Sequence, residues 1–285
     1  MTLQEMRPML KLFTAHNSIC TQKVFLTLIE KELPWTSEYI DLFNNEQYRP
    51  EYLKLNPKGV VPTLIHEDHA IVESTLICEY LDQTFPQPSL VPASAFERAQ
   101  MRRWSKHIDE GVFEATREIS FSAMFRDKMK AMTQEQRDGR YRNIGDPGRR
   151  ARMISTYELG CDSPFVAQGI FAFEKMFGEM EECLSDGRSW LVGPNFSLAD
   201  INVIPFTARL NYLTLLDVWI KDRPLVAAWW QKAKARPSFA GAVAQLLGEN
   251  QIRTMAESGS RIKGEIAAKH AEIVKARQLA LDAAA

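Results

Sequence analysis

The stretch NPKGVVPTLIHEDHAIVES, residues 56–74, contains residue types that could together hold one end of a peptide. Val61 and Pro62 lie where a short apolar strand is expected to begin. Proline cannot donate to a sheet ladder, and a cis bond here would turn the N–H and C=O of Val61 outward, where an extended peptide could pair with them. Glu73 and Ser74 lie where a second apolar segment meets a helix, whose unpaired N–H groups attract anions. Ser74 could bind a carboxylate and Glu73 an ammonium group, which describes a receptor for a peptide that carries an α-amino acid at one end.

The same residues also have a purely structural interpretation. Pro62 could simply open an edge strand, and Ser74 could cap the helix that follows it. The spacing alone favours neither interpretation, so both stay open at this point.

The elements that would position these residues alternate between strand and helix. Apolar and β-branched segments predict strands, and an apolar stripe with helical spacing predicts helices. In order, we expect a strand at 9–14, a helix at 18–32, a strand at 35–42, a helix at 45–55, a strand pair at 60–65 and 70–74, and a helix at 74–85. This order predicts a small α/β domain over residues 9–85.

The rest of the chain carries helical patterns only. The proline-rich residues 86–93 predict a linker, residues 94–250 an all-helical domain, and residues 251–285 a helical extension. Residues 96–125 predict one long amphipathic helix. The basic, glycine-punctuated residues 137–152 predict an exposed connection, because no aromatic platform supports a nucleic-acid patch there. In FSLADINVIPF, Ser197 and Asp200 predict a well-capped helix start.

Composition excludes several classes of partner. Lys plus Arg total 35 against 36 Asp plus Glu, so no net field attracts nucleic acid or an anionic membrane. No apolar run approaches the roughly 18–20 residues that span a bilayer, and MTLQEMRPML lacks the pattern of a secretory signal. We therefore expect a cytoplasmic protein. Neither the histidines nor the cysteines have metal-ligand spacing, so we expect no metal and reduced thiols at Cys20, Cys78, Cys161 and Cys183.

In combination, these features resemble the glutathione transferases. The resemblance rests on VVPTL with a following ES at a helix start, the linker, the all-helical second half and the SLAD helix start, and it covers roughly residues 9–250. It implies an α/β thioredoxin-like N-terminal domain followed by an all-α helical C-terminal domain, glutathione as co-substrate, and a homodimer. Val61 would pair with the cysteinyl backbone of glutathione, and Glu73 and Ser74 would hold its γ-glutamyl end. Within the family, ESTLICEYLDQTFPQPSLVP and ERAQMRRW are most similar to the bacterial β-aryl etherases, which cleave lignin-type aryl ethers.

The resemblance also implies a partner for the glutathione thiol. The register of the turn TAHNSICTQKV assigns this role to Ser18, with Asn17 beside it. A thiol with a pKa of about 8.5 needs about 2.7 kcal/mol of preference for its anion to drop by about two units. One hydroxyl donor and a helix N-terminus can supply an effect of that size. Ser18 can equally be a plain helix cap, and the two roles are compatible.

The glycyl end of glutathione is where the sequence departs from the family pattern. Many relatives carry a lysine immediately before the Val-Pro pair, and this chain has Val60 at that position. Lys58 or Gln47 could replace that lysine.

Three functions remain open from the sequence. The first is an enzyme in which glutathione thiolate attacks an electrophilic carbon of a hydrophobic aromatic substrate, with β-aryl ether cleavage as one version and conjugation or dehalogenation as the wider class. The second is a thiol-redox enzyme that uses Cys20, and the third is a non-catalytic glutathione or aromatic ligand-binding protein. For the acceptor pocket of the enzyme, the candidate side chains are those of His107, Phe113, Glu114, Arg117 and Phe121.

Overall fold

The structure is a computed structural model that describes residues 10–283. The first residue of the strand expected at 9–14 and the last two residues of the helical extension lie outside the described residues. The described chain forms two compact units. The first contains residues 10–105, 190–205 and 232–248, and the second contains residues 106–189, 206–231 and 249–283.

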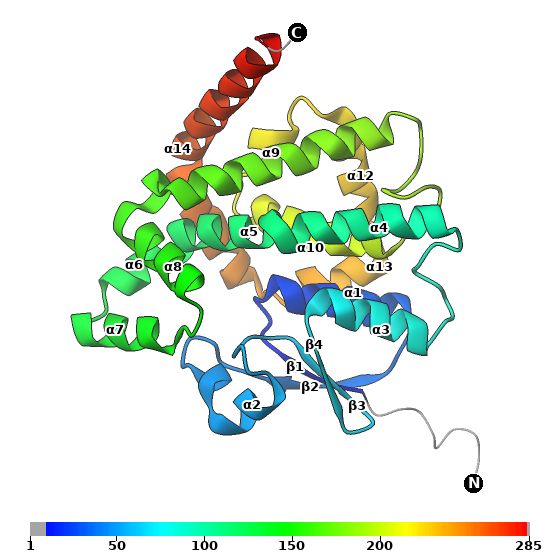
Figure 1. Cartoon of the computed structure of the whole chain (residues 1–285), viewed down its shortest axis with the longest axis horizontal. Helices are drawn as coiled ribbons and strands as arrows, with labels where there is room; N and C mark the ends of the chain where they lie inside the picture. Colours follow the sequence, from blue (N-terminus) through cyan, green and yellow to red (C-terminus); the bar gives the residue numbers. More distant parts are fainter. Residues whose placement is uncertain (1–9, 284–285) are drawn as a thin grey trace. The chain divides into compact units, whose positions relative to one another are not determined.

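The first unit is built on a four-stranded mixed sheet with the strand order β2-β1-β3-β4 (Figure 1). The central strand β1 (Leu10–Thr14) is parallel to β2 (Trp35–Tyr39) and antiparallel to β3 (Thr63–His66), and β3 pairs in turn with β4 (His69–Val72). The α/β prediction for this region is therefore confirmed. The strand expected at 60–65 begins only at Thr63, so Pro62 lies immediately before the sheet and leaves its ladder intact.

Helices α1 and α3 pack against each other in this unit, as Figure 1 shows in blue and cyan. Buried apolar residues at helical spacing, among them Val24 and Leu28, make one face of α1. The helical elements that lie wholly in the first unit are α1 (Ile19–Glu30), η1 (Glu46–Tyr48), α2 (Pro50–Leu55), α3 (Ser74–Thr84), α13 (Pro237–Phe239) and the wide turn η5 (Ala240–Ala244). Residues of α4 (Ala95–His107), α10 (Leu198–Tyr212) and α12 (Pro224–Lys234) belong partly to each unit.

A buried ion pair fixes the segment that follows α3. Lys31 Nζ lies 2.7 Å from Asp82 Oδ1 and also donates to the carbonyl of Pro88 at 2.7 Å. The same carboxylate accepts the backbone N–H of Leu90 at 2.8 Å. The residues expected to form a linker are therefore held against α1 and α3.

The capped start predicted for α10 is present. Asp200, which is fully buried, accepts hydrogen bonds from the backbone N–H of Leu191 at 3.0 Å and of Ser197 at 3.2 Å. The hydroxyl of Ser197 accepts the N–H of Ala199 at 3.3 Å. Side chains thus satisfy N–H groups that a buried helix start would otherwise leave unpaired.

The second unit is helical. The elements that lie wholly within it are η2 (Ile108–Val112), α5 (Phe113–Ser120), η3 (Phe121–Phe125), α6 (Arg126–Lys130), α7 (Gln134–Asn143), α8 (Pro147–Leu159), η4 (Gly160–Asp162), α9 (Pro164–Leu184), α11 (Asp217–Ile220) and α14 (Glu249–Asp282). The helix expected at 96–125 is continuous but contains the two wide turns η2 and η3. None of the helices in residues 10–283 is both long enough and apolar enough to cross a bilayer.

The irregular connection expected at 137–152 is wrong, because α7 and α8 fill most of that range, although α7 has no buried residue and lies at the surface as expected. Thr133 and Gln136 form a reciprocal capping box at the start of α7, and Asp146 caps α8. Basic side chains then bind backbone carbonyls at helix ends, as Arg150 does to Ile144 at 2.6 Å. The arginines that suggested a solvated loop therefore help to terminate helices.

Candidate functional site

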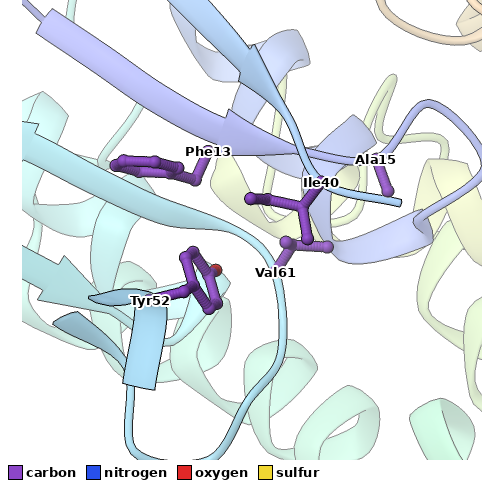
Figure 2. Close-up of a cluster of buried hydrophobic side chains, with 5 residues drawn as sticks. All are labelled: Phe13, Ala15, Ile40, Tyr52 and Val61. Carbon is purple, nitrogen blue, oxygen red and sulfur yellow. The ribbon is translucent and has the colours of Figure 1, made fainter. Parts of the chain in front are cut away.

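The loop before β3 carries Val61, the residue expected to pair with a peptide. The Val61–Pro62 bond is cis. The side chain of Val61 is buried in a cluster with Phe13, Ile40 and Tyr52 (Figure 2). Within residues 10–283, neither the N–H nor the C=O of Val61 has a hydrogen-bond partner. The side chain is thus anchored while both backbone polar groups remain available to a ligand.

Two polar side chains of the α2 region hold this loop on both sides of Val61. Tyr52 Oη donates to the carbonyl of Val60 at 2.6 Å and lies 2.9 Å from Thr63 Oγ1. Asn56 Nδ2 reaches the same two groups, at 2.9 Å and 3.2 Å. Burial raises the pKa of Tyr52 above its ordinary value, so its hydroxyl stays protonated. The sequence interpretation missed both residues; their four-residue spacing, which places them on one helix face, was the only local signal.

The first N–H groups of α3 have no partners inside the helix. The first intrahelical bond runs from the N–H of Ile77 to the carbonyl of Glu73, at 2.8 Å. Glu73 is the N-cap residue and makes no side-chain cap bond, so the helix-capping role considered for Ser74 is wrong. Ser74 is instead the first helical residue, and its hydroxyl has no partner among the described side chains and backbone. The Ser74 hydroxyl therefore lies at the positive end of α3, which suits an anion.

Glu73 has an unusual backbone conformation. Its φ of 70° lies in the left-handed region, which costs a residue with a Cβ roughly 1 kcal/mol or more. Its carboxylate lies 2.6 Å from Lys58 Nζ, and both side chains are exposed. Lys58 and Glu73 were expected at opposite ends of glutathione, and here they pair with each other. An exposed pair of this kind contributes at most about 1 kcal/mol.

Gln47 lies under the other side of the same loop. Its side chain is buried, and Nε2 donates weakly to the carbonyl of Leu42 at 3.4 Å. Oε1 has no partner within the part of the chain that the structure describes. Gly59 approaches so closely that a Cβ there would lie 3.2 Å from the Gln47 carbonyl and 2.8 Å from the ring of Tyr48. The backbone of Gln47 is thus packed beside the residues that lead to Val61.

Ser18 caps α1. Its Oγ accepts the N–H of Thr21 at 3.3 Å, and its side chain is half-buried. The hydroxyl hydrogen has no acceptor in residues 10–283, so it can donate to a ligand while the oxygen keeps its cap bond. No acidic residue occupies the first turn of α1, which leaves the positive end of the helix dipole uncompensated. Asn17 and Cys20 flank this position and are both half-buried.

The residues expected around an acceptor substrate belong to the second unit. His107 Nε2 lies 2.8 Å from Glu179, Arg117 pairs with Glu114 at 2.5 Å, and Phe121 is buried. Their assignment to an acceptor pocket stays a prediction. No group of three or more His, Cys, Asp or Glu side chains in the described chain could hold a metal ion.

A four-stranded mixed sheet, with a cis-proline loop before β3 and helices α1 and α3 packed together, is the arrangement of a thioredoxin-like domain. The model of the "Glutathione S-transferase, N-terminal domain" matches residues 12–89, and that of the "Glutathione S-transferase, C-terminal domain" matches residues 165–231. Protein LigF of Sphingobium sp. (strain NBRC 103272 / SYK-6) is 34% identical over 248 residues, which are 81% of this chain and 91% of LigF. The chain belongs to the glutathione S-transferase family.

Other relatives agree with this assignment. The tetrachloro-p-hydroquinone reductive dehalogenase of Sphingobium chlorophenolicum is 27% identical over 81% of this chain and 94% of its own length. The crystal structure of beta-etherase LigF from Sphingobium sp. strain SYK-6 superimposes with a TM-score of 0.72 at 28% identity, covering 82% of this chain and 98% of LigF. Glutathione transferase F7 from Populus trichocarpa gives 0.63 at 26% identity, covering 83% and 98%. The predicted fold class and the predicted family are confirmed.

Proposed function

We propose that this glutathione S-transferase uses the thiolate of glutathione to cleave a β-aryl ether bond in a hydrophobic aromatic substrate. The observation that carries the proposal is the state of Ser18, whose oxygen caps α1 while its hydroxyl hydrogen is available. A thiolate at this position would accept that hydrogen and lie at the positive end of the helix. The similarity to a protein named beta-etherase supports the choice of reaction.

The peptide part of glutathione would occupy the loop and the start of α3. The cysteinyl backbone would pair with the N–H and C=O of Val61 beside Pro62. The γ-glutamyl carboxylate would accept from the Ser74 hydroxyl and the first N–H groups of α3, and its ammonium group would pair with Glu73 in place of Lys58. Lys58, released from that pair, would reach the glycyl carboxylate. Asn17 and Gln47 would complete the contacts beside the thiol and the glycyl end.

The reaction itself needs little from the protein beyond orientation and charge stabilisation. The thiol loses its proton to solvent as the thiolate forms. The sulfur then bonds to the ether carbon while the carbon–oxygen bond breaks, and both electrons of that bond leave with the phenolate. The phenolate takes up a proton from solvent, so the products are a glutathione thioether and a phenol.

The test uses a β-aryl ether whose phenolate absorbs visible light, mixed with glutathione and the full chain. Ser18→Ala should lower kcat/KM by about 10- to 100-fold near pH 7, because the thiol pKa returns toward about 8.5. The loss should shrink above that pH, and Ser18→Thr should retain most of the activity. Ser163→Ala removes the cap of α9 in the second unit and the contact with Ser155, and it serves as the control for lost stability without a change beside Ser18. Unchanged turnover in Ser18→Ala would refute the role of Ser18.

A redox function is the second candidate, because Cys20 is half-exposed in the first turn of α1, where a helix N-terminus favours a thiolate. A glutathione adduct on Cys20 in mass spectra of the intact protein would support it. Binding of glutathione without turnover of any ether or halide would support a non-catalytic ligand-binding role. We also propose, from the family resemblance, that the protein is a cytoplasmic homodimer.

A further inference from the structure

Two buried lysines reach α3, one from within α1 (Lys23) and one from the C-cap position that ends α1 (Lys31). The charge of Lys31 is balanced, because its ammonium group forms an ion pair with the carboxylate of Asp82 at 2.7 Å. Lys23 is fully buried as well, but its Nζ donates to a hydroxyl, Thr75 Oγ1, at 2.7 Å. No carboxylate in residues 10–283 forms an ion pair with Lys23.

The position of Lys23 is electrostatically unfavourable in two ways. An ammonium group out of water loses its solvation, and one hydroxyl contact replaces only part of it. Thr75 is the second residue of α3, so the ammonium group also lies at the positive end of that helix. The neighbouring thiol of Cys78 does not balance the charge of Lys23. Cys78 Sγ donates to the carbonyl of Lys23 at 3.7 Å. Burial raises the pKa of Cys78 to about 11, so that thiol is neutral near pH 7.

Both costs would fall if an anion bound at the start of α3. Ser74, the neighbour of Thr75, presents its hydroxyl at that point, and its own N–H has no partner inside the helix. A carboxylate there would face a helix N-terminus and a buried cation that water screens poorly. The buried charge of Lys23, which is unfavourable in the protein without a ligand, would then strengthen binding of the anion.

We infer that Lys23 is a positioning residue whose buried charge is complemented by the γ-glutamyl carboxylate of bound glutathione. The inference rests on the proposed glutathione site. It adds a residue that takes no part in the backbone pairing proposed for Val61. Lys23 acts through Thr75, which it holds in place at the first turn of α3.

The inference predicts opposite effects of two similar substitutions. Lys23→Met removes an uncompensated buried charge, so the unfolding midpoint in urea should stay unchanged or rise, while the affinity for glutathione falls by about tenfold or more. Lys31→Met leaves Asp82 buried without its partner, so the unfolding midpoint should drop, while glutathione affinity in the folded protein is kept. Lys23→Arg, which keeps the charge, should retain part of the affinity.

The deciding experiment is a calorimetric titration with two ligands, both S-methylated so that no thiol ionises. One is S-methylglutathione, and the other is its analogue with 4-aminobutyrate in place of the γ-glutamyl residue, which lacks only the α-carboxylate. Lys23→Met should weaken the first ligand by about tenfold and leave the second unchanged. Lys23→Gln repeats the measurement with a second neutral side chain if the methionine variant does not fold.

The outcomes separate the inference from the proposed function. Equal losses for both ligands would overturn the inference, because they would mean that Lys23 only supports the shape of the site. An unchanged affinity for S-methylglutathione in a folded neutral variant would overturn it too. Failure of the unsubstituted protein to bind S-methylglutathione would instead overturn the proposed glutathione site, and the inference with it.

Discussion

Removal of one hydroxyl group, in Tyr52→Phe, should loosen the loop that carries Val61 without disturbing the core around it. The ring would keep its edge-on packing against Phe13, with centroids 5.5 Å apart. The variant loses the 2.6 Å bond to the Val60 carbonyl and the 2.9 Å contact with Thr63 Oγ1. Asn56 still reaches both groups, so neither is left wholly unpaired.

The expected size follows from these contacts. A neutral hydrogen bond contributes about 0.5–1.5 kcal/mol net, so the loss of the Tyr52 hydroxyl should destabilise the protein by about 1–2 kcal/mol. The loop would then have to be ordered by the ligand. If ordering the loop reduces the binding free energy by about 1 kcal/mol, the affinity for glutathione should fall roughly fivefold.

Tyr80→Phe is the matched control. Tyr80 is also partly buried in the first unit, and its hydroxyl lies 2.7 Å from His66 Nδ1, so the substitution removes one hydrogen bond of similar length. Urea unfolding should report destabilisation of both variants, whereas calorimetry should report weaker glutathione binding only for Tyr52→Phe. Equal affinities in the two variants would refute the reasoning that the Tyr52 hydroxyl orders the loop for its ligand.

Further predictions concern α14 and its surroundings. Burial pushes the pKa of Glu174 upward, but hydrogen bonds from His270 and Arg223 outweigh it and hold the pKa below its ordinary value. A lowered carboxyl pKa stabilises the fold above the unfolded value of 4.5, and this contribution is lost as the pH falls further; urea midpoints measured between pH 3 and 7 should decline less steeply for Glu174→Gln. Gly259→Ala would place a Cβ 1.8 Å from a backbone oxygen and should cost about 2 kcal/mol or more. Gly264→Ala, with nothing within 4 Å on the same helix, should instead add about 0.4–1 kcal/mol, and equal melting temperatures for the two alanine variants would contradict this.

Local patterns were sufficient for most elements of the fold. The apolar stripe of α1, the hairpin of β3 and β4 and the capped start of α10 depend on neighbours a few residues away, so they could be predicted from the sequence. The missed helices at 137–152 had a local signal as well. Thr133 and Gln136 have the spacing of a capping box, but the glycines and arginines that follow outweighed it in the interpretation.

The candidate site likewise has residues that local patterns marked and contacts that they could not predict. The sequence, with the family resemblance, was enough to single out Ser18, Val61, Glu73 and Ser74, because each lies at a strand or helix end that the local pattern marks. Their roles in binding remain predictions. The pairing of Lys58 with Glu73 was not foreseen, because fifteen positions separate these residues along the chain.

The sequence by itself determined which segments become strands and helices, since periodicity and caps act within one or two turns. Only the tertiary structure decided what the polar side chains between those segments do. Lys23 lies in α1 and Lys31 caps its C-terminus, and nothing local distinguishes a lysine beside a hydroxyl from one beside a carboxylate. Their partners are 52 and 51 residues away on α3, and the packing of the two helices chooses them. Because of that packing, Asp82 balances the charge of Lys31, whereas the charge of Lys23 is left for a ligand to balance.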